Sequence, residues 1–303
     1  PVSALFLIRR CVQEWSVVLI PCRELAATIS PRRCNTRCQI VDFVGAAAGR
    51  RMLSGQVVRL SKKIASHPLY LRIKLLLKRL SGRELRIRSD VALETDSAGG
   101  WTFSKNHLGH GSTAYSLGIG DFIAFDLLLI EVYGSTVHAF DPTPTSVESI
   151  KNQDLTRQFV FHPWAVAGSD GVLRMTQRVN RKGRKSNTMW TAVLEPSDGA
   201  EVIEVPCFSL ASIMKKLNHK TIDLLKIDVE GSEYEIIESL IVLPNKPGQL
   251  LIEFHHRFPN IGLERTAEAI RKLRAVGYRV FAVSGTGREI SFIHESRLSG
   301  QTN

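Results

Sequence analysis

Two carboxylates and a glycine, Asp228, Glu230 and Gly231, directly follow a short apolar run. The run at 222–227 is typical of a buried parallel strand, and the apolar residues after Gly231 recur at helical spacing. In an open α/β sheet, ligands bind at the carboxyl ends of the strands. We therefore expect Asp228 and Glu230 to line an active-site cleft, although the helix dipole alone also favours acids at a helix N-terminus.

A turn with two glycines, Gly118 and Gly120, lies between an expected strand and an expected helix, and Asp121 follows it. Glycine lets the backbone approach a ligand closely, and a helix N-terminus adds a positive dipole. Asp141 closes the next strand 21 residues after Gly120, near the ~20-residue spacing at which an acid accepts the ribose hydroxyls. The pattern predicts an adenosine-containing ligand.

The identity of that ligand depends on a missing glycine. A dinucleotide needs a third glycine to seat its pyrophosphate, but Ile123 stands three residues after Gly120. S-adenosylmethionine has no phosphate, and its sulfonium and amino-acid ends suit a turn that carries Asp121. The turn thus favours S-adenosylmethionine over a nicotinamide dinucleotide, which leaves an NAD-dependent oxidoreductase as the alternative enzyme.

Four segments together resemble the FkbM-type S-adenosylmethionine-dependent methyltransferases: 118–120, 138–144, 225–234 with its Lys-Ile-Asp-Val-Glu-Gly run, and 251–256. The resemblance covers about residues 100–295. It implies an α/β fold, the Rossmann-like class I methyltransferase fold, with a seven-stranded, mostly parallel sheet whose last strand is antiparallel. It also implies methyl transfer, most often to a hydroxyl oxygen. Many members carry a longer Asp-x-Gly-Ala-Asn-x-Gly turn where this chain has residues 116–120.

Methyl transfer to a hydroxyl needs a base at the strand ends. Alternation along the strand at 249–254 places Glu253 and His255 on one face and His256 on the other. With Asp228 and Glu230, these residues are the candidates for the base, and Glu230 is expected to orient the substrate or cofactor. Asp228 is also counted among the cofactor-binding residues. Alternatively, Asp228, Glu230, Glu253 and a histidine gather a divalent metal, which the resemblance does not require.

Strands and helices alternate from residue 112 onward, which is typical of a parallel sheet with helices on both faces. An insertion at 171–206 is expected to form a hairpin with a basic tip at 181–185. We expect strands at 113–117, 136–140, 159–161, 222–227, 249–254, 278–283 and 290–293, and helices at 122–132, 146–152, 209–217, 233–240 and 263–276.

The N-terminal third differs from the rest in charge. Residues 1–100 hold 18 Lys and Arg against 7 Asp and Glu, which accounts for the whole net charge of +11. Residues 1–50 are expected to be a poorly ordered basic segment, which is absent from the natural protein if Met52 is the start. Residues 51–100 are expected to be a helical extension, with basic amphipathic helices at 54–80 split by Pro68 and a boundary at 97–100. The methyltransferase domain then covers 101–303.

Such basic helices contact an anionic membrane or cap a core with their cations in water. In a non-catalytic alternative, the sheet is an adenosine-binding scaffold and these helices make a membrane-associated module. Aromatic residues are not interleaved with the basic tip, so we expect no nucleic-acid partner. The expected partner is a small-molecule or saccharide acceptor, and the oligomeric state is left open.

Apolar runs are shorter than the ~18 residues a membrane span needs. The five cysteines form no disulfide framework, and the pair Cys34 and Cys38 lacks a second ligand pair for zinc. We expect a reducing compartment, the cytoplasm.

Overall fold

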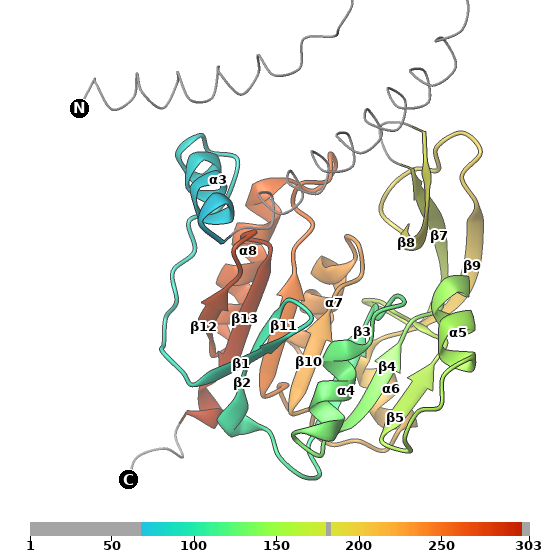
Figure 1. Cartoon of the computed structure of the whole chain (residues 1–303), viewed down its shortest axis with the longest axis horizontal. Helices are drawn as coiled ribbons and strands as arrows, with labels where there is room; N and C mark the ends of the chain where they lie inside the picture. Colours follow the sequence, from blue (N-terminus) through green and yellow to red (C-terminus); the bar gives the residue numbers. More distant parts are fainter. Residues whose placement is uncertain (1–67, 180–182, 299–303) are drawn as a thin grey trace, which may run out of the picture. The chain divides into compact units, whose positions relative to one another are not determined.

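The computed structural model describes residues 68–179 and 183–298 (Figure 1). The expected poorly ordered segment at 1–50, and the part of the expected helices at 54–67, lie outside the described residues. Among the described residues, no helix is long and apolar enough to cross a membrane.

A seven-stranded sheet forms the centre of the fold, in the order β12-β13-β11-β10-β3-β4-β5. Strands β11, β10, β3, β4 and β5 are parallel, whereas β13 runs antiparallel to both of its neighbours. This topology confirms the predicted fold class. The strands are β3 (Thr113–Leu117), β4 (Thr136–Phe140), β5 (Phe159–His162), β10 (Leu224–Ile227), β11 (Gln249–Glu253), β12 (Tyr278–Val283) and β13 (Glu289–His294).

Helices cover both faces of this sheet (Figure 1). Because side chains alternate along a strand, Leu224 packs with Leu129 of α4 on one face, while Leu225 packs with Ile237 of α7 on the other. Two separate apolar cores hold the sheet in place, so its strand ends are fixed in space. The helices are α4 (Ala124–Glu131), α5 (Pro144–Lys151), α6 (Leu210–Lys216), α7 (Glu233–Leu240) and α8 (Gly262–Ala275).

The segment before residue 105 differs from the expected helical extension. Helix α3 (Pro68–Leu80) begins at the predicted proline, but residues 81–94 form no helix. Strands β1 (Thr95–Ala98) and β2 (Trp101–Ser104) then form an antiparallel hairpin. Its turn is Gly99-Gly100, with φ of 57° and 90°, in the place where a domain boundary was expected.

This hairpin packs against the central sheet. The Ser104 backbone N–H donates to Gln249 Oε1 over 2.8 Å, and Gln249 Nε2 donates to the Ser104 carbonyl over 3.0 Å. Trp101 and Phe103 are buried in the same core as α4. The folded body therefore includes residues N-terminal to 101.

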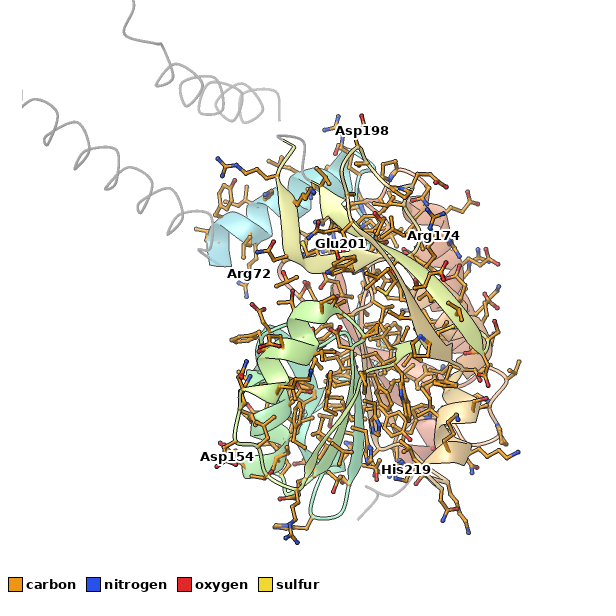
Figure 2. The ribbon with its side chains drawn as sticks, turned by 90° about the vertical axis from the view of Figure 1, so that its right-hand side faces the viewer. Arg72, Asp154, Arg174, Asp198, Glu201 and His219 are labelled. Carbon is orange, nitrogen blue, oxygen red and sulfur yellow. The ribbon has the colours of Figure 1, made fainter. Side chains whose placement is uncertain are left out.

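The insertion forms a second sheet, in the order β6-β9-β7-β8. Strands β7 and β8 pair antiparallel, as predicted for the hairpin, and residues 180–182, which include the start of the basic tip, lie outside the described residues. In Figure 2, Arg174, Asp198 and Glu201 mark this part of the chain, at the opposite end of the view from Asp154 and His219. The strands are β6 (Ala165–Val166), β7 (Gly171–Val179), β8 (Lys185–Thr191) and β9 (Val202–Phe208).

Candidate active site

A cavity of about 210 Å³ lies where the strand order changes direction, at the carboxyl ends of β3, β4 and β10. Its walls are the glycine turn 117–121, the strand end 140–143, the acid stretch 228–230 and apolar side chains of the second sheet. A ligand is expected at this position in an open α/β sheet. Six of the predicted residues line the cavity: Gly118, Gly120, Asp121, Asp141, Asp228 and Glu230.

Gly118 brings the turn into contact with β10. Its φ is 71°, and a Cβ at this position would lie 1.8 Å from the Asp228 carbonyl oxygen. On the other side, Lys226 Nζ donates to the Gly118 carbonyl over 2.9 Å, and its ammonium lies 5.1 Å from the centre of the Trp101 ring. The turn that was predicted to bind the cofactor is thus fixed to the strand that carries the acids.

Asp141 is buried and holds the same turn from the side of β4. Its Oδ2 accepts a hydrogen bond from the Gly120 backbone N–H over 2.9 Å. Its Oδ1 accepts from the Thr143 backbone N–H over 2.9 Å and from Thr143 Oγ1 over 2.7 Å. The carboxylate lines the cavity at the predicted ribose-binding position. Asp121 also lines the cavity but is exposed.

Asp228 follows β10 and lines the cavity from the opposite side. Among the described residues, no donor makes a hydrogen bond or ion pair with its carboxylate. Burial raises the pKa of Asp228 above its ordinary value, although the charges of Lys226 and His255 oppose the shift. A largely enclosed carboxylate with free lone pairs is suited to accept a proton.

Glu230 is held by the second sheet. Its φ of 49° is a left-handed conformation, which costs a non-glycine residue about 1–3 kcal/mol and persists only where neighbours restrain it. Thr191 Oγ1 donates to the Glu230 carbonyl over 2.6 Å, and Arg178 Nη1 donates to Glu230 Oε2 over 2.7 Å. The Arg178 guanidinium also lies 4.7 Å from the centre of the Phe258 ring. Strands β7 and β8 therefore restrain both the backbone and the side chain of Glu230.

His255 lies among three glutamates behind the cavity. Its Nε2 is 3.4 Å from Glu230 Oε2 and 3.9 Å from Glu253 Oε1, and its Nδ1 is 3.4 Å from Glu233 Oε2. Although burial opposes the shift, these carboxylates raise the pKa of His255 to about 9. The buried Glu233 also accepts from the Gly231 and His255 backbone N–H groups over 2.9 and 2.7 Å. His255 is therefore a cation that links α7, β11 and the acid stretch.

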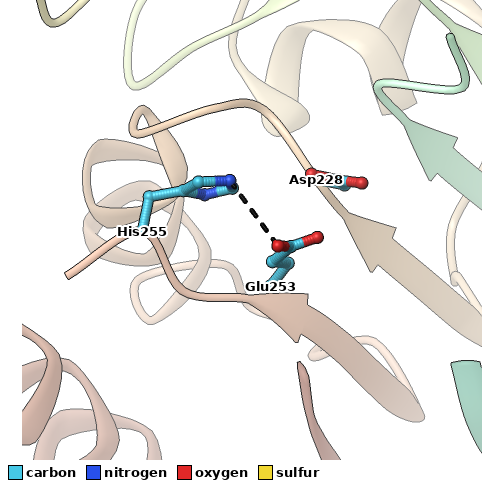
Figure 3. A group of neighbouring side chains, drawn as sticks. All are labelled: Asp228, Glu253 and His255. Atoms are coloured by element: carbon cyan, nitrogen blue, oxygen red, sulfur yellow. Dashed lines mark ion pairs between the residues drawn. The ribbon is translucent and has the colours of Figure 1, made fainter. Parts of the chain in front are cut away.

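Glu253 ends β11 beside Asp228 and His255, and Figure 3 shows the three side chains together. Burial and the Asp228 charge raise the pKa of Glu253 to about 7, although the guanidinium of Arg288 contacts its carboxylate. The ligand atoms of Asp228, Glu253 and His255 lie within 4.8 Å of one another, a spacing that also suits a divalent cation. In this structure Arg288 and His255 supply the positive charge there.

His256 lies apart from this group. Its Nε2 is 2.7 Å from Glu84 Oε1, and Glu84 also contacts Arg257. Neither Glu253 nor the two histidines line the cavity, so Glu253 and His255 reach it only through Asp228 and Glu230. Sequence reasoning missed the cations Arg178, Lys226 and Arg288 and the buried acid Glu233. Only Lys226 could have been found from the sequence, because a lysine inside an apolar strand indicates a buried charge that needs a partner.

Comparisons with known proteins identify the family of this chain. A family model described as the methyltransferase FkbM domain matches residues 114–280. The chain belongs to the FkbM methyltransferase family. Residues 114–280 thus form a domain of a methyltransferase family whose cofactor is S-adenosyl-L-methionine, and the NAD-dependent oxidoreductase alternative is set aside. The FkbM match includes the glycine turn, Asp141 and all five residues predicted to be catalytic.

Two curated relatives share part of this FkbM region. The probable methyltransferase-like protein 24 of Homo sapiens is 27% identical over 148 residues, which are 48% of this chain and 33% of that protein. The same protein of Rattus norvegicus is 24% identical over 159 residues, 52% of this chain and 36% of that protein. The match thus spans about a third of the length of these relatives.

Among solved structures, fibrillarin of Aeropyrum pernix in complex with natively bound S-adenosyl-L-methionine overlaps this chain at a TM-score of 0.34 and 12% identity. The overlap covers 62% of this chain and 67% of fibrillarin. The strand order of the central sheet, and not this overlap, defines the fold class.

The residues around the cavity fit the cofactor of the family. Phe140, Pro142 and Val166 offer apolar surface for an adenine ring, and Asp141, the predicted ribose acceptor, lines the same cavity. Trp190 also lines the cavity, and its buried Nε1 has no hydrogen-bond partner among the described residues. A buried donor without a partner is costly, and a bound ligand that supplies an acceptor removes that cost.

Proposed function

We propose that this methyltransferase methylates a hydroxyl oxygen of a small-molecule or saccharide acceptor, with Asp228 as the general base. The observation that carries the proposal is the Asp228 carboxylate, which lines the cavity, has a raised pKa and accepts no hydrogen bond from a described residue. A neutral hydroxyl needs such a base, because it loses its proton poorly in water near pH 7.

The glycine turn and Asp141 would hold the nucleoside part of the cofactor, in the cavity that the acid stretch also lines. Bound S-adenosylmethionine supplies an electrophilic methyl carbon attached to sulfur. Asp228 would take the hydroxyl proton as the acceptor oxygen receives the methyl group, and S-adenosylhomocysteine would be the leaving group. The protonated Asp228 then returns its proton to water after the product leaves.

Glu230 orients the acceptor. Arg178 and His255 both face its Oε2, while Oε1 has no hydrogen-bond partner among the described residues. Because Thr191 restrains the backbone as well, Oε1 is fixed in direction and accepts a hydrogen bond from a hydroxyl of the acceptor. Two acids in one wall repel anionic groups, which favours neutral, hydroxyl-bearing acceptors over phosphorylated ones.

An acceptor is first found by incubating a metabolite extract with radiolabelled methyl donor and isolating the labelled product. Asp228→Asn then tests the base, because it preserves shape and removes proton affinity. We expect kcat to fall by about 10²–10⁴-fold, with unchanged affinity for S-adenosylhomocysteine. Asp154→Asn, an exposed aspartate at the other end of the view in Figure 2, is the matched control.

Full turnover by Asp228→Asn contradicts the assignment of the base. A label found on nitrogen, sulfur or carbon in the product contradicts oxygen methylation, and leaves the family membership untouched.

A further inference from the structure

Helix α3 (Pro68–Leu80) turns a stripe of large apolar side chains away from the body. On its inner side, Leu75 is buried against Gly287 and Leu71 lies against Gly285, both in the turn between β12 and β13. The apolar residues on the other sides are between 41% and 64% exposed: Leu69, Tyr70, Ile73, Leu76, Leu77 and Leu80. At ~100° per residue they form one arc opposite Leu75.

Cations stand along both edges of this stripe. By the same helical spacing, exposed Arg72 falls just outside one edge of the arc and exposed Lys74 just outside the other. The helix also carries Lys78 and Arg79 in its last turn and contains no acidic residue. Figure 2 labels Arg72 on α3, where its side chain stands on the outside of the molecule.

We propose that α3 docks on an anionic lipid membrane, with the stripe in the boundary between head groups and acyl chains. An apolar stripe edged by cations and free of acids matches such a surface, because apolar side chains enter the lipid while Arg and Lys reach the phosphates. A protein groove would need acids on both of its rims to match the same helix. With 13 residues, α3 lies on the membrane and does not cross it.

The position of α3 determines which end of the fold would face the membrane. The turn that carries it, at 284–288, follows β12 at its carboxyl end and leads into β13, whose Glu289 pairs with Glu253. Helix α3 and the second sheet therefore lie at the same end of the central sheet as the cavity (Figures 1 and 2). A membrane bound at α3 faces the end of the fold where the cavity opens.

Vesicle sedimentation with the full 303-residue chain tests the proposal. The vesicles contain phosphatidylcholine alone or equal parts of phosphatidylcholine and phosphatidylserine. We expect binding to the mixed vesicles and little to the neutral ones. Ile73→Ser/Leu77→Ser changes the centre of the stripe at two exposed positions. We expect the affinity for the mixed vesicles to fall by about tenfold or more.

Two matched variants separate the stripe from general surface effects. Val132→Ser/Val242→Ser makes the same kind of change at two exposed positions outside α3, and we expect binding within about twofold of wild type. Arg72→Gln/Lys74→Gln is expected to weaken binding about fivefold, and Lys151→Gln/Arg271→Gln, exposed elsewhere, much less. Thermal melts confirm that every variant is folded.

Three results overturn the proposal. The first is equal binding of wild type and Ile73→Ser/Leu77→Ser to mixed vesicles, which would place the contact outside α3. The second is equal binding of wild type to neutral and anionic vesicles. The third is no vesicle binding, with Ile73→Ser/Leu77→Ser changing a dimer to a monomer in sedimentation equilibrium, because a second copy of the chain then covers the stripe.

Discussion

Each of the two strands that flank β3 is followed directly by an aspartate, and the two carboxylates differ in their hydrogen bonds. Asp141 after β4 accepts three hydrogen bonds, two of them from backbone N–H groups, whereas Asp228 after β10 accepts none from the described residues. A carboxylate held by backbone donors is fixed in place and suits binding. A carboxylate left without donors keeps its affinity for a proton and suits chemistry.

The largest effect is expected where the binding half of the site (the glycine turn with Asp141) contacts the catalytic half (Asp228 with Glu230). Gly118→Ala places a Cβ 1.8 Å from the Asp228 carbonyl oxygen, so the turn and β10 must separate. We expect more than about 3 kcal/mol lower free energy of unfolding in urea, and no detectable S-adenosylhomocysteine binding. Gly120→Ala is the matched control: it also has a positive φ, of 59°, but open space around its Cβ. Equal losses in both variants would show that only backbone strain matters.

Glu230→Gln tests the catalytic half alone. The change keeps the size of the side chain and the bond from Thr191, but it removes the charge that Arg178 and His255 share. We expect turnover to fall about 10²-fold, with unchanged cofactor affinity. Full activity in this variant would remove Glu230 from the reaction, and a parallel loss of cofactor binding would place it in the other half.

Asp141→Ala tests the binding half. It removes the predicted ribose acceptor and frees Gly120 from its hydrogen bond. We expect S-adenosylmethionine affinity in a calorimetric titration to fall at least about tenfold. Asp121→Ala, exposed in the same wall, is expected to have a smaller effect. Unchanged affinity in Asp141→Ala would refute the ribose assignment.

The two halves should also differ in their response to pH. Above pH 7 Glu253, with a pKa of about 7, is ionised, and its charge strengthens Asp228 as a base. Below pH 7 the pair of Glu253 and Asp228 shares a proton, so Asp228 is a weaker base. We expect kcat to fall about fivefold from pH 7 to pH 6 while S-adenosylhomocysteine affinity stays constant. Glu253→Gln should flatten the profile, and an affinity that follows kcat would contradict the separation of roles.

The smallest effect is expected from removing divalent cations. Arg288 and His255 already place positive charge beside Glu253. We expect dialysis against EDTA to leave turnover within about twofold. A loss that Mg²⁺ or Mn²⁺ restores would instead identify Asp228, Glu253 and His255 as metal ligands.

The sequence was sufficient to predict the central sheet, because each of its strands is a short apolar run bounded by turns. It also located Asp141 and Asp228, since the carboxyl ends of parallel strands meet at one edge of the sheet. It did not predict the hairpin β1–β2, because β1 (Thr-Asp-Ser-Ala) and the following Gly99-Gly100 have the same composition as a linker.

Charge partners were beyond the reach of sequence patterns. Arg178 lies 52 residues before Glu230, on a different sheet. Nothing local in the sequence indicates such a pair, because it depends on how the insertion folds back. The expected separation of His255 from His256 agrees with the structure, but the partner of His256 is Glu84 in the segment after α3, which periodicity cannot reveal.

The hairpin β7–β8 has a further consequence for how selectivity changes in this family. It supplies apolar wall to the cavity and, through Arg178 and Thr191, also sets the position of Glu230. A hairpin exchanged between relatives to alter the acceptor therefore carries part of the catalytic geometry with it. Under the proposed role of Glu230, acceptor choice and reaction rate both depend on this one segment, and we expect a chimaera to stay active only if Arg178 and Thr191 are transferred together with it.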